Sequence, residues 1–118
     1  MNRNHLSTLP VWALLAGGIL SAQEPAIHLS QSEAIRAAKE RPAPDYPAIA
    51  RQLHVEGEVQ IQAHISESGI VEDAKPLTGN ALLVTAAVTA MRRWKFTPTI
   101  TDGKPRKAVA EVSFTFKL

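Results

Sequence analysis

Two stretches of the chain alternate apolar and polar residues with a period of two. Over residues 55–65 the apolar side chains fall between Glu, Gln and His, and over residues 109–118 they fall between Glu, Ser, Thr and Lys. This period predicts β-strands with one buried and one solvated face. Gly57 replaces an apolar residue in the first stretch, which indicates a bulge or a close packing neighbour there.

The residues between these two strands predict a turn, a second strand and a helix. Residues 66–69 (Ser-Glu-Ser-Gly) are typical of a tight turn, so residues 70–75 are expected to return as the second strand of an antiparallel hairpin. Pro76 is expected to end that strand. Over residues 81–94 apolar residues recur every three or four positions, with Val88 among them, which predicts an amphipathic helix after a loop and cap at residues 78–80.

The block at residues 91–98, Met-Arg-Arg-Trp-Lys-Phe-Thr-Pro, lies where this helix changes to extended chain. Pro98 prevents the helix from continuing. Trp94 and Phe96 follow the apolar helix face directly, so we expect them to anchor the core rather than to stack on a ligand. Residues 101–105 beyond the block are expected to form a loop.

The first residues predict an export signal. Residues 11–20 are apolar or small throughout, they follow a modestly positive start with Arg3, and small residues lead up to Ala22. Cleavage after Ala22 would remove residues 1–22 and leave the protein in the periplasm. No Lys, Arg, Asp or Glu occurs from Asn4 to Gln23, so an uncleaved anchor in the inner membrane is the alternative.

A leader over residues 23–42 is expected to precede a domain over residues 43–118. In the leader, residues 23–30 are expected to be loose, and residues 32–40 are expected to form a short helix with an N-terminal serine as cap. Three prolines between positions 42 and 47 favour extended geometry. Pro47 suits the start of a short helix over residues 48–53. Docking of the 32–40 helix on the domain is left open.

Composition narrows the fold and the function. A chain of 118 residues with 45% hydrophobic and 20% charged residues holds one domain at most. The absence of cysteine excludes disulfides and thiolate chemistry, and a net charge of +2 is not the footprint of a nucleic-acid binder. The order of elements predicts an α+β fold, with a small three-stranded antiparallel sheet and helices packed on one face. The other sheet face is expected to be solvated.

The sequence contains no motif in which catalytic or cofactor-binding residue types have the spacing that their chemistry requires. The four histidines lack metal-ligand spacing, and there is no glycine-rich phosphate loop or nucleophile motif. Glu56 and Glu58 lie about 7 Å apart on one strand face, but exposed strand carboxylates usually serve solubility, so catalysis through Glu58 is a weak hypothesis. We therefore expect no enzyme and no cofactor. The edge of the small sheet, with its free backbone donors and acceptors, is the expected functional surface.

Taken in order, these segments resemble the C-terminal domain of the TonB/TolA family, and TonB most closely. The resemblance covers about residues 43–118 and rests on these pieces: Asp-Tyr-Pro at 45–47, Ala-Arg at 50–51, Val-Glu-Gly-Glu-Val at 55–59, Ser-Gly-Ile-Val at 68–71, the block at 91–98, and Phe-Thr-Phe-Lys at 114–117. The family often has a glutamine three residues before the tyrosine, where this chain has Ala43.

The resemblance implies a non-enzymatic periplasmic module for energy-coupled transport. Its partners would be outer-membrane transporters, which offer an extended peptide, the TonB box, to the last strand by β-augmentation. The residues implied in peptide binding are Val109, Glu111, Val112, Ser113, Phe114, Thr115 and Phe116, together with Pro44, Asp45 and Tyr46. Structural roles are expected for Pro47, Gly57, Gly69, Trp94, Phe96 and Pro98.

A full energy transducer of this family has an anchor helix with an intramembrane histidine and a long proline-rich spacer. Here residues 11–20 contain no histidine. The leader, even fully extended at ~3.5 Å per residue, spans about 70 Å. Coupling to the inner-membrane ExbB/ExbD motor is therefore not expected. The alternative function is an envelope structural or adaptor protein that pairs the same strand edge with another copy as a homodimer.

Overall fold

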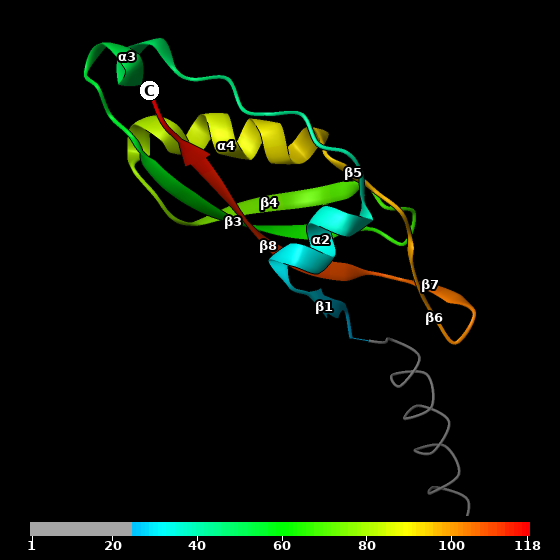
Figure 1. Ribbon diagram of the computed structural model, residues 1–118. Coiled ribbons are helices and arrows are strands. Elements are labelled where there is room, and N and C mark those ends of the chain that lie inside the picture. The colour runs from blue at the N-terminus through cyan, green and yellow to red at the C-terminus, as the bar shows by residue number, and fades with distance from the viewer. Residues whose placement is uncertain (1–24) are drawn as a thin grey trace, which may run out of the picture.

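The computed structural model describes residues 25–118, so the expected signal or anchor over residues 1–22 lies outside the described residues. Within the described range no helix is long and apolar enough to cross a membrane. Helices and strands share one core, which confirms the predicted α+β class (Figure 1). The elements are β1 (Ile27–Leu29), α2 (Gln31–Ala37), β2 (Ala38–Glu40), α3 (Ala48–Gln52), β3 (Gly57–Ile65), β4 (Val71–Thr78), α4 (Ala81–Arg93), β5 (Lys95–Phe96), β6 (Thr99–Thr101), β7 (Lys104–Arg106) and β8 (Ala108–Phe116).

The main sheet has four strands in the order β1-β8-β3-β4. The three antiparallel strands expected from the sequence are present, with β3 in the centre between β4 and β8. The β3–β8 ladder runs without a register shift from Gly57↔Phe116 to Ile65↔Ala108. The fourth strand, β1, comes from residues expected to be loose, and it pairs in parallel with the start of β8.

The core lies between the sheet and α4, which follows the sheet over β3 and β4 (Figure 1). The period-two alternation of β3 and β8 places every second side chain in this core, as predicted. Trp94 and Phe96 are both buried, and the Trp94 ring lies edge-on to Phe114 with centroids 5.5 Å apart. Two details differ from expectation: Val88 of α4 is only half-buried, and Leu118 lies beyond the end of β8 and is exposed.

The leader packs on the domain. Ser30, rather than Ser32, caps α2, since its hydroxyl accepts from the Glu33 amide (3.2 Å) and the Glu33 carboxylate accepts from the Ser30 amide (2.9 Å). This is a capping box. Ala34 on the opposite side is fully buried, which ties α2 to the core.

The expectation that the leader helix continues to residue 40 is wrong. The helix ends at Ala37, and the next three residues form β2, which pairs with β5. The Ala37 carbonyl accepts from the Thr97 amide (2.8 Å). Backbone pairing with a strand distant in sequence therefore overrides the helix propensity of the segment.

Three further local expectations are corrected. β4 continues through Pro76 to Thr78, because an outer strand needs no ladder donor on its open side. Gly57 has no bulge, since the register shifts of β3 lie further along the strand, and it instead adopts a φ of 153°. The expected loop at residues 101–105 is part of the β6–β7 hairpin, whose turn consists of Asp102 and Gly103, both with positive φ.

The turn at Gly69 is tied to the block at residues 91–98. Gly69 has a φ of 90°, and a Cβ atom at this position would lie 1.9 Å from the Phe96 carbonyl oxygen. The Phe96 amide donates to the Gly69 carbonyl (2.9 Å). Pro47 precedes α3, and its carbonyl accepts from the Arg51 amide (3.0 Å). Pro98 lies half-buried between β5 and β6.

Candidate functional site: the outer edge of β8

The outer edge of β8 is open over most of its length. β1 pairs only with Ala108, Val109 and Ala110. Within residues 25–118 no strand lies on that side of residues 111–116. The expected edge is therefore shorter than the strand, because Val109 is covered by β1.

The direction of the backbone groups on this edge follows from one hydrogen bond. The Lys107 carbonyl accepts from the Ile27 amide of β1 (2.8 Å), so the backbone groups of Lys107 face outward. Successive residues of a strand direct these groups to opposite edges, so Glu111, Ser113 and Thr115 also face outward. They form an extended row of donors and acceptors that have no neighbouring strand, which is a template for another chain.

The sequence-predicted site residues on β8 divide into two groups. Glu111 and Thr115 are exposed and Ser113 is half-buried, and the structure brings these three together on the solvated face. Val112, Phe114 and Phe116 are buried in the core, so their side chains are not available to a peptide. Their contribution is to hold the strand in place.

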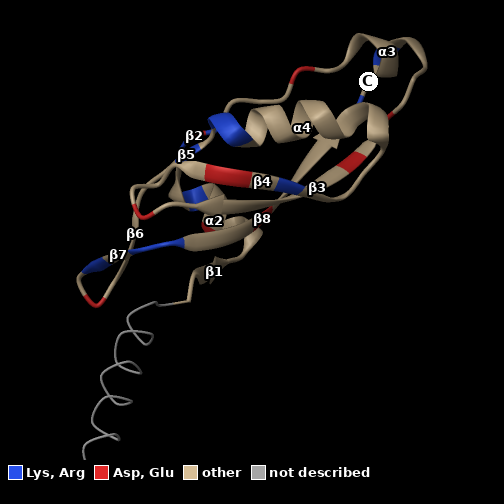
Figure 2. Ribbon diagram, turned by 180° about the vertical axis from the view of Figure 1, so that it is seen from behind, with Lys and Arg blue, Asp and Glu red and all other residues tan. Residues whose placement is uncertain are grey.

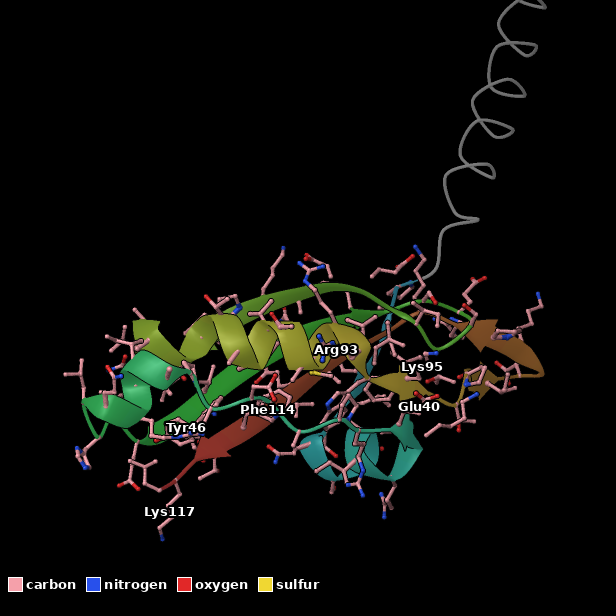
Figure 3. All side chains as sticks on the ribbon, turned by 90° about the horizontal axis from the view of Figure 1, so that it is seen from above. Glu40, Tyr46, Arg93, Lys95, Phe114 and Lys117 are labelled. Carbon is pink, nitrogen blue, oxygen red and sulfur yellow. The ribbon has the colours of Figure 1, made fainter. Side chains whose placement is uncertain are left out.

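Tyr46 holds the extended segment before α3 against the end of β8. Its hydroxyl donates to the Val55 carbonyl, and its ring lies edge-on to Phe116 with centroids 5.6 Å apart. Burial raises the pKa of the Tyr46 hydroxyl above its ordinary value; the Glu56 carboxylate raises it further and Arg51 opposes the rise. Figure 3 shows Tyr46 on this segment, which runs between α4 and β8.

Pro44 and Asp45 line a groove of about 190 Å³ whose other wall is α4. Arg93 of α4 belongs to that wall and is labelled in Figure 3. The segment is held there by the Trp94 indole, whose Nε1 donates to the Pro42 carbonyl (3.2 Å). The structure thus joins Tyr46 to β8 and places Pro44 and Asp45 beside α4.

A hollow of about 510 Å³ lies where β1 ends and α2 begins, directly beside the open part of the edge. It is lined by His28, Leu29, Ser30, Gln31, Glu33, Gln60, Val109, Glu111 and Ser113. The backbone amide of Ser30, and then its hydroxyl, lower the pKa of the Glu33 carboxyl. The sequence reasoning missed this hollow because it predicted neither β1 nor the packing of α2.

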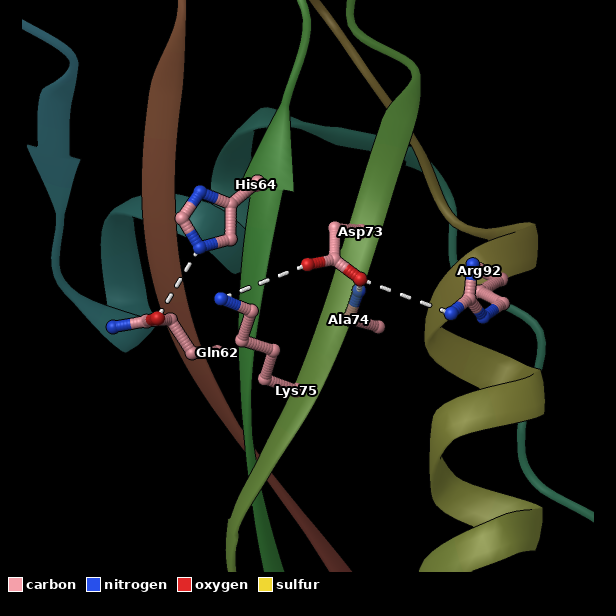
Figure 4. Close-up of polar contacts among 6 residues, drawn as sticks. All are labelled: Gln62, His64, Asp73, Ala74, Lys75 and Arg92. Atoms are coloured by element: carbon pink, nitrogen blue, oxygen red, sulfur yellow. Dashed lines mark hydrogen bonds and ion pairs between the residues drawn. The ribbon is translucent and has the colours of Figure 1, made fainter.

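The opposite edge of the sheet, on β4, has a different surface. Figure 2 shows acidic and basic residues along β4, and Figure 4 shows Asp73 between two cations. The Asp73 carboxylate lies 3.9 Å from Lys75 Nζ and 3.8 Å from Arg92 Nη2. On the neighbouring strand the His64 ring and the Gln62 side chain form a hydrogen bond (3.2 Å; Figure 4). These charges and Pro76 make β4 a poor template for strand addition.

Within residues 25–118 no three side chains of the metal-binding types converge on one point. Of the two carboxylates considered for catalysis, Glu56 accepts from the Leu118 amide (2.6 Å) and so holds the end of the chain beside β3. Glu58 is exposed on the solvated face.

Comparison with known proteins agrees with this geometry. Residues 42–118 match the family model described as the Gram-negative bacterial TonB protein C-terminal. The chain is 35% identical to "Protein tonB2" of Pseudomonas aeruginosa, over 65% of this chain and 29% of that protein. It is 34% identical to "Protein TonB" of Vibrio cholerae, over 64% of this chain and 32% of that protein. It is 31% identical to "Protein TonB" of Escherichia coli, over 66% of this chain and 31% of that protein.

The chain therefore spans about a third of the length of the curated relatives it matches. Among solved structures it is similar to the solution NMR structure of the Pseudomonas aeruginosa TonB CTD, with a TM-score of 0.58 and 26% sequence identity. That similarity covers 69% of this chain and 84% of the other.

Proposed function

Because the chain belongs to the family of Gram-negative bacterial TonB C-terminal domains, we propose that it is a non-enzymatic periplasmic module that captures extended peptide segments of outer-membrane transporters. Export would depend on residues 1–22, as a cleaved signal or a retained anchor. The partner segment would add to the sheet along the outer edge of β8 and take part in energy-coupled transport.

The observation that carries this proposal is the open row of backbone groups at Glu111, Ser113 and Thr115. Each backbone hydrogen bond contributes about 0.5–1.5 kcal/mol net, so a few of them give modest affinity once the ordering of the peptide is subtracted. Specificity has to come from the side chains on the solvated face and from the neighbouring hollow. This combination suits a partner that binds and releases repeatedly.

The proposal predicts the effect of a proline at the centre of the edge. Ser113→Pro removes an outward-facing donor without removing a donor to β3, and we expect it to weaken peptide binding at least tenfold, about 1.4 kcal/mol. Ser113→Thr keeps the donor and is the matched control. The measurement is calorimetric titration of each full-length variant with synthetic N-terminal segments of TonB-dependent transporters from the same genome, with circular dichroism to verify folding. Equal affinity of two folded variants would show that peptides do not bind through this edge.

A second candidate function uses the same edge for self-association. The open row on β8 would also pair with a second copy of the chain, giving a strand-paired dimer as an envelope structural or adaptor protein. Sedimentation of the unmodified chain over a range of concentrations separates the two candidates. A dimer that Ser113→Pro disrupts would favour self-association, and a monomer at all concentrations would exclude it.

A further inference from the structure

β1 occupies the first part of the edge to which the proposed partner would bind. It lies parallel to β8 and pairs with Ala108–Ala110, while the edge beyond it is open. Its position is the one that an added strand would take. The protein therefore already holds a short strand of its own on its proposed peptide site.

The attachment of β1 is weak by its composition and length. It has three residues; His28 is exposed, and Ile27 and Leu29 are only half-buried. Ordering the backbone of each residue costs about 1–2 kcal/mol. Each backbone hydrogen bond returns about 1 kcal/mol net. The cost for three residues, about 3–6 kcal/mol, is larger than a few hydrogen bonds return. The partial burial of Ile27 and Leu29 offsets the rest, so small changes shift the pairing of β1.

The elements on either side of β1 keep it close to the edge. Before it, Arg106 Nη2 on β7 donates to the Pro25 carbonyl (2.6 Å). After it, the capping box at Ser30 and the burial of Ala34 fix α2. Release of β1 thus requires backbone rotation near Ser30 together with rotation near Pro25 or loss of the Arg106 hydrogen bond. A released β1 remains at high local concentration.

We propose that β1 is a self-docked strand that competes with the partner peptide for the start of the β8 edge, so that it regulates this site. The inference rests on the proposed function. With β1 docked, a partner pairs with residues 111–116; with β1 released, the whole of β8 accepts a partner. A partner long enough to reach Ala108 has to displace β1, whereas a shorter one does not.

The size of the effect follows from population arithmetic. The apparent affinity of a long peptide falls by the fraction of molecules in which β1 is released, so a strand docked about nine-tenths of the time lowers the affinity about tenfold. A peptide confined to residues 112–116 is unaffected. Length dependence therefore distinguishes competition from a general change in the domain.

The test uses two proline variants of the full chain. Ile27→Pro removes the amide that donates to the Lys107 carbonyl. His28→Pro is the matched control, because its amide faces away from β8 by the alternation of the strand. The probes are a synthetic transporter N-terminal segment as long as β8, nine residues, and a truncated form that reaches only residues 112–116. Both are titrated into each variant by calorimetry.

We expect Ile27→Pro to bind the long peptide roughly three- to tenfold more tightly than the unmodified chain, with no change for the short peptide and none for His28→Pro. Amide exchange gives a reading without peptide: Val109, whose amide faces β1, should exchange faster in Ile27→Pro than in His28→Pro. Binding of both peptides with equal affinity by all three chains would overturn the competition and leave the proposed function intact. If neither peptide binds to any of the three chains by calorimetry, the proposed function itself is overturned.

Discussion

β4 and the part of β8 that β1 leaves uncovered differ in how readily an added strand could pair with them. β4 carries Pro76, an ion-pair group around Asp73 and two register shifts against β3. β8 has no proline, pairs with β3 in unbroken register, and offers an outer row of backbone groups beyond β1. The two strands are of comparable length. β4 is an outer strand that its own residues protect, whereas β8 is covered only at its start, by β1.

The difference indicates where this small domain would accept the partner that the proposed function requires. Because β4 is protected, the uncovered part of β8 is the more favourable place for strand addition. On the proposed functions, binding and self-association would therefore compete for β8. The buried side chains of Val112, Phe114 and Phe116 hold β8 in the sheet. The backbone groups on its open edge remain free to pair with an added strand. A stable strand with an unprotected edge is suited to β-augmentation.

The largest effect should come from removing the core support of β8. Phe114→Ala deletes a buried ring that contacts Trp94, and we expect it to lower the free energy of unfolding by about 3–5 kcal/mol. Leu77→Ala on β4 is the contrasting change; its side chain is 44% exposed, and a loss within about 0.5 kcal/mol is expected. Urea unfolding of the two variants measures both. Equal losses of unfolding free energy would show that the core supports β4 and β8 equally, which would contradict the difference described above.

The next largest effect concerns the segment that supports the end of β8. Tyr46→Phe removes the donor to the Val55 carbonyl while keeping the ring against Phe116. We expect a loss of about 1 kcal/mol in unfolding free energy. Amide exchange should speed up at Thr115 and Phe116 and stay unchanged along β4. A uniform change across both strands would mean that Tyr46 does not act locally on β8.

A smaller effect should appear when the protection of β4 is removed. In an outer strand the amide side of a proline faces solvent, so Pro76→Thr adds an outward donor to the β4 edge. We expect little change in stability, within about 0.5 kcal/mol, but weak self-association at high concentration. Sedimentation velocity at increasing concentration checks this, with Leu77→Thr as a control that adds no backbone donor and removes no charge. Identical behaviour of the two variants would show that Pro76 does not protect the edge.

The smallest effect is the pH response of the leader beside β8. The pKa of Glu33 is lowered in the folded protein by the Ser30 amide and hydroxyl. Because the pKa of Glu33 is lower in the folded protein, the ionised carboxylate stabilises the folded state. This stabilisation is fully present above the ordinary pKa of 4.5 and is lost as the pH falls through the lowered value. NMR shifts of the Ser30 and Glu33 amides should therefore change in that acid range. Glu33→Gln should remove the response; its persistence would assign it to another group.

The long elements were predictable because their periodicity is local. Alternation over residues 57–65 and 108–116 and the apolar repeat leading to Trp94 indicate β3, β8 and α4. The same alternation places Val112, Phe114 and Phe116 inward, so their burial follows from the pattern that named them as strand residues. The pattern also places the side chains of Glu111, Ser113 and Thr115 on the solvated face of the sheet.

The short elements were not predictable, because pairing with distant residues creates them. Nothing local distinguishes Ile27–Leu29 from loose chain, and it becomes β1 only beside Ala108–Ala110. β2 exists because β5 pairs with it, at the expense of the last turn of the expected helix. The partial cover of the β8 edge and the adjoining hollow depend on these elements, so sequence reasoning could locate the edge but not its limits.

On the proposed function, the outer edge of β8 accepts an extended peptide and the edge of β4 does not. An NMR titration of the full chain with synthetic N-terminal segments of TonB-dependent transporters from the same genome tests it directly. We expect amide shifts concentrated at Glu111, Ser113 and Thr115, with β4 unaffected. Shifts along β4, or none on β8 with any segment, would contradict it.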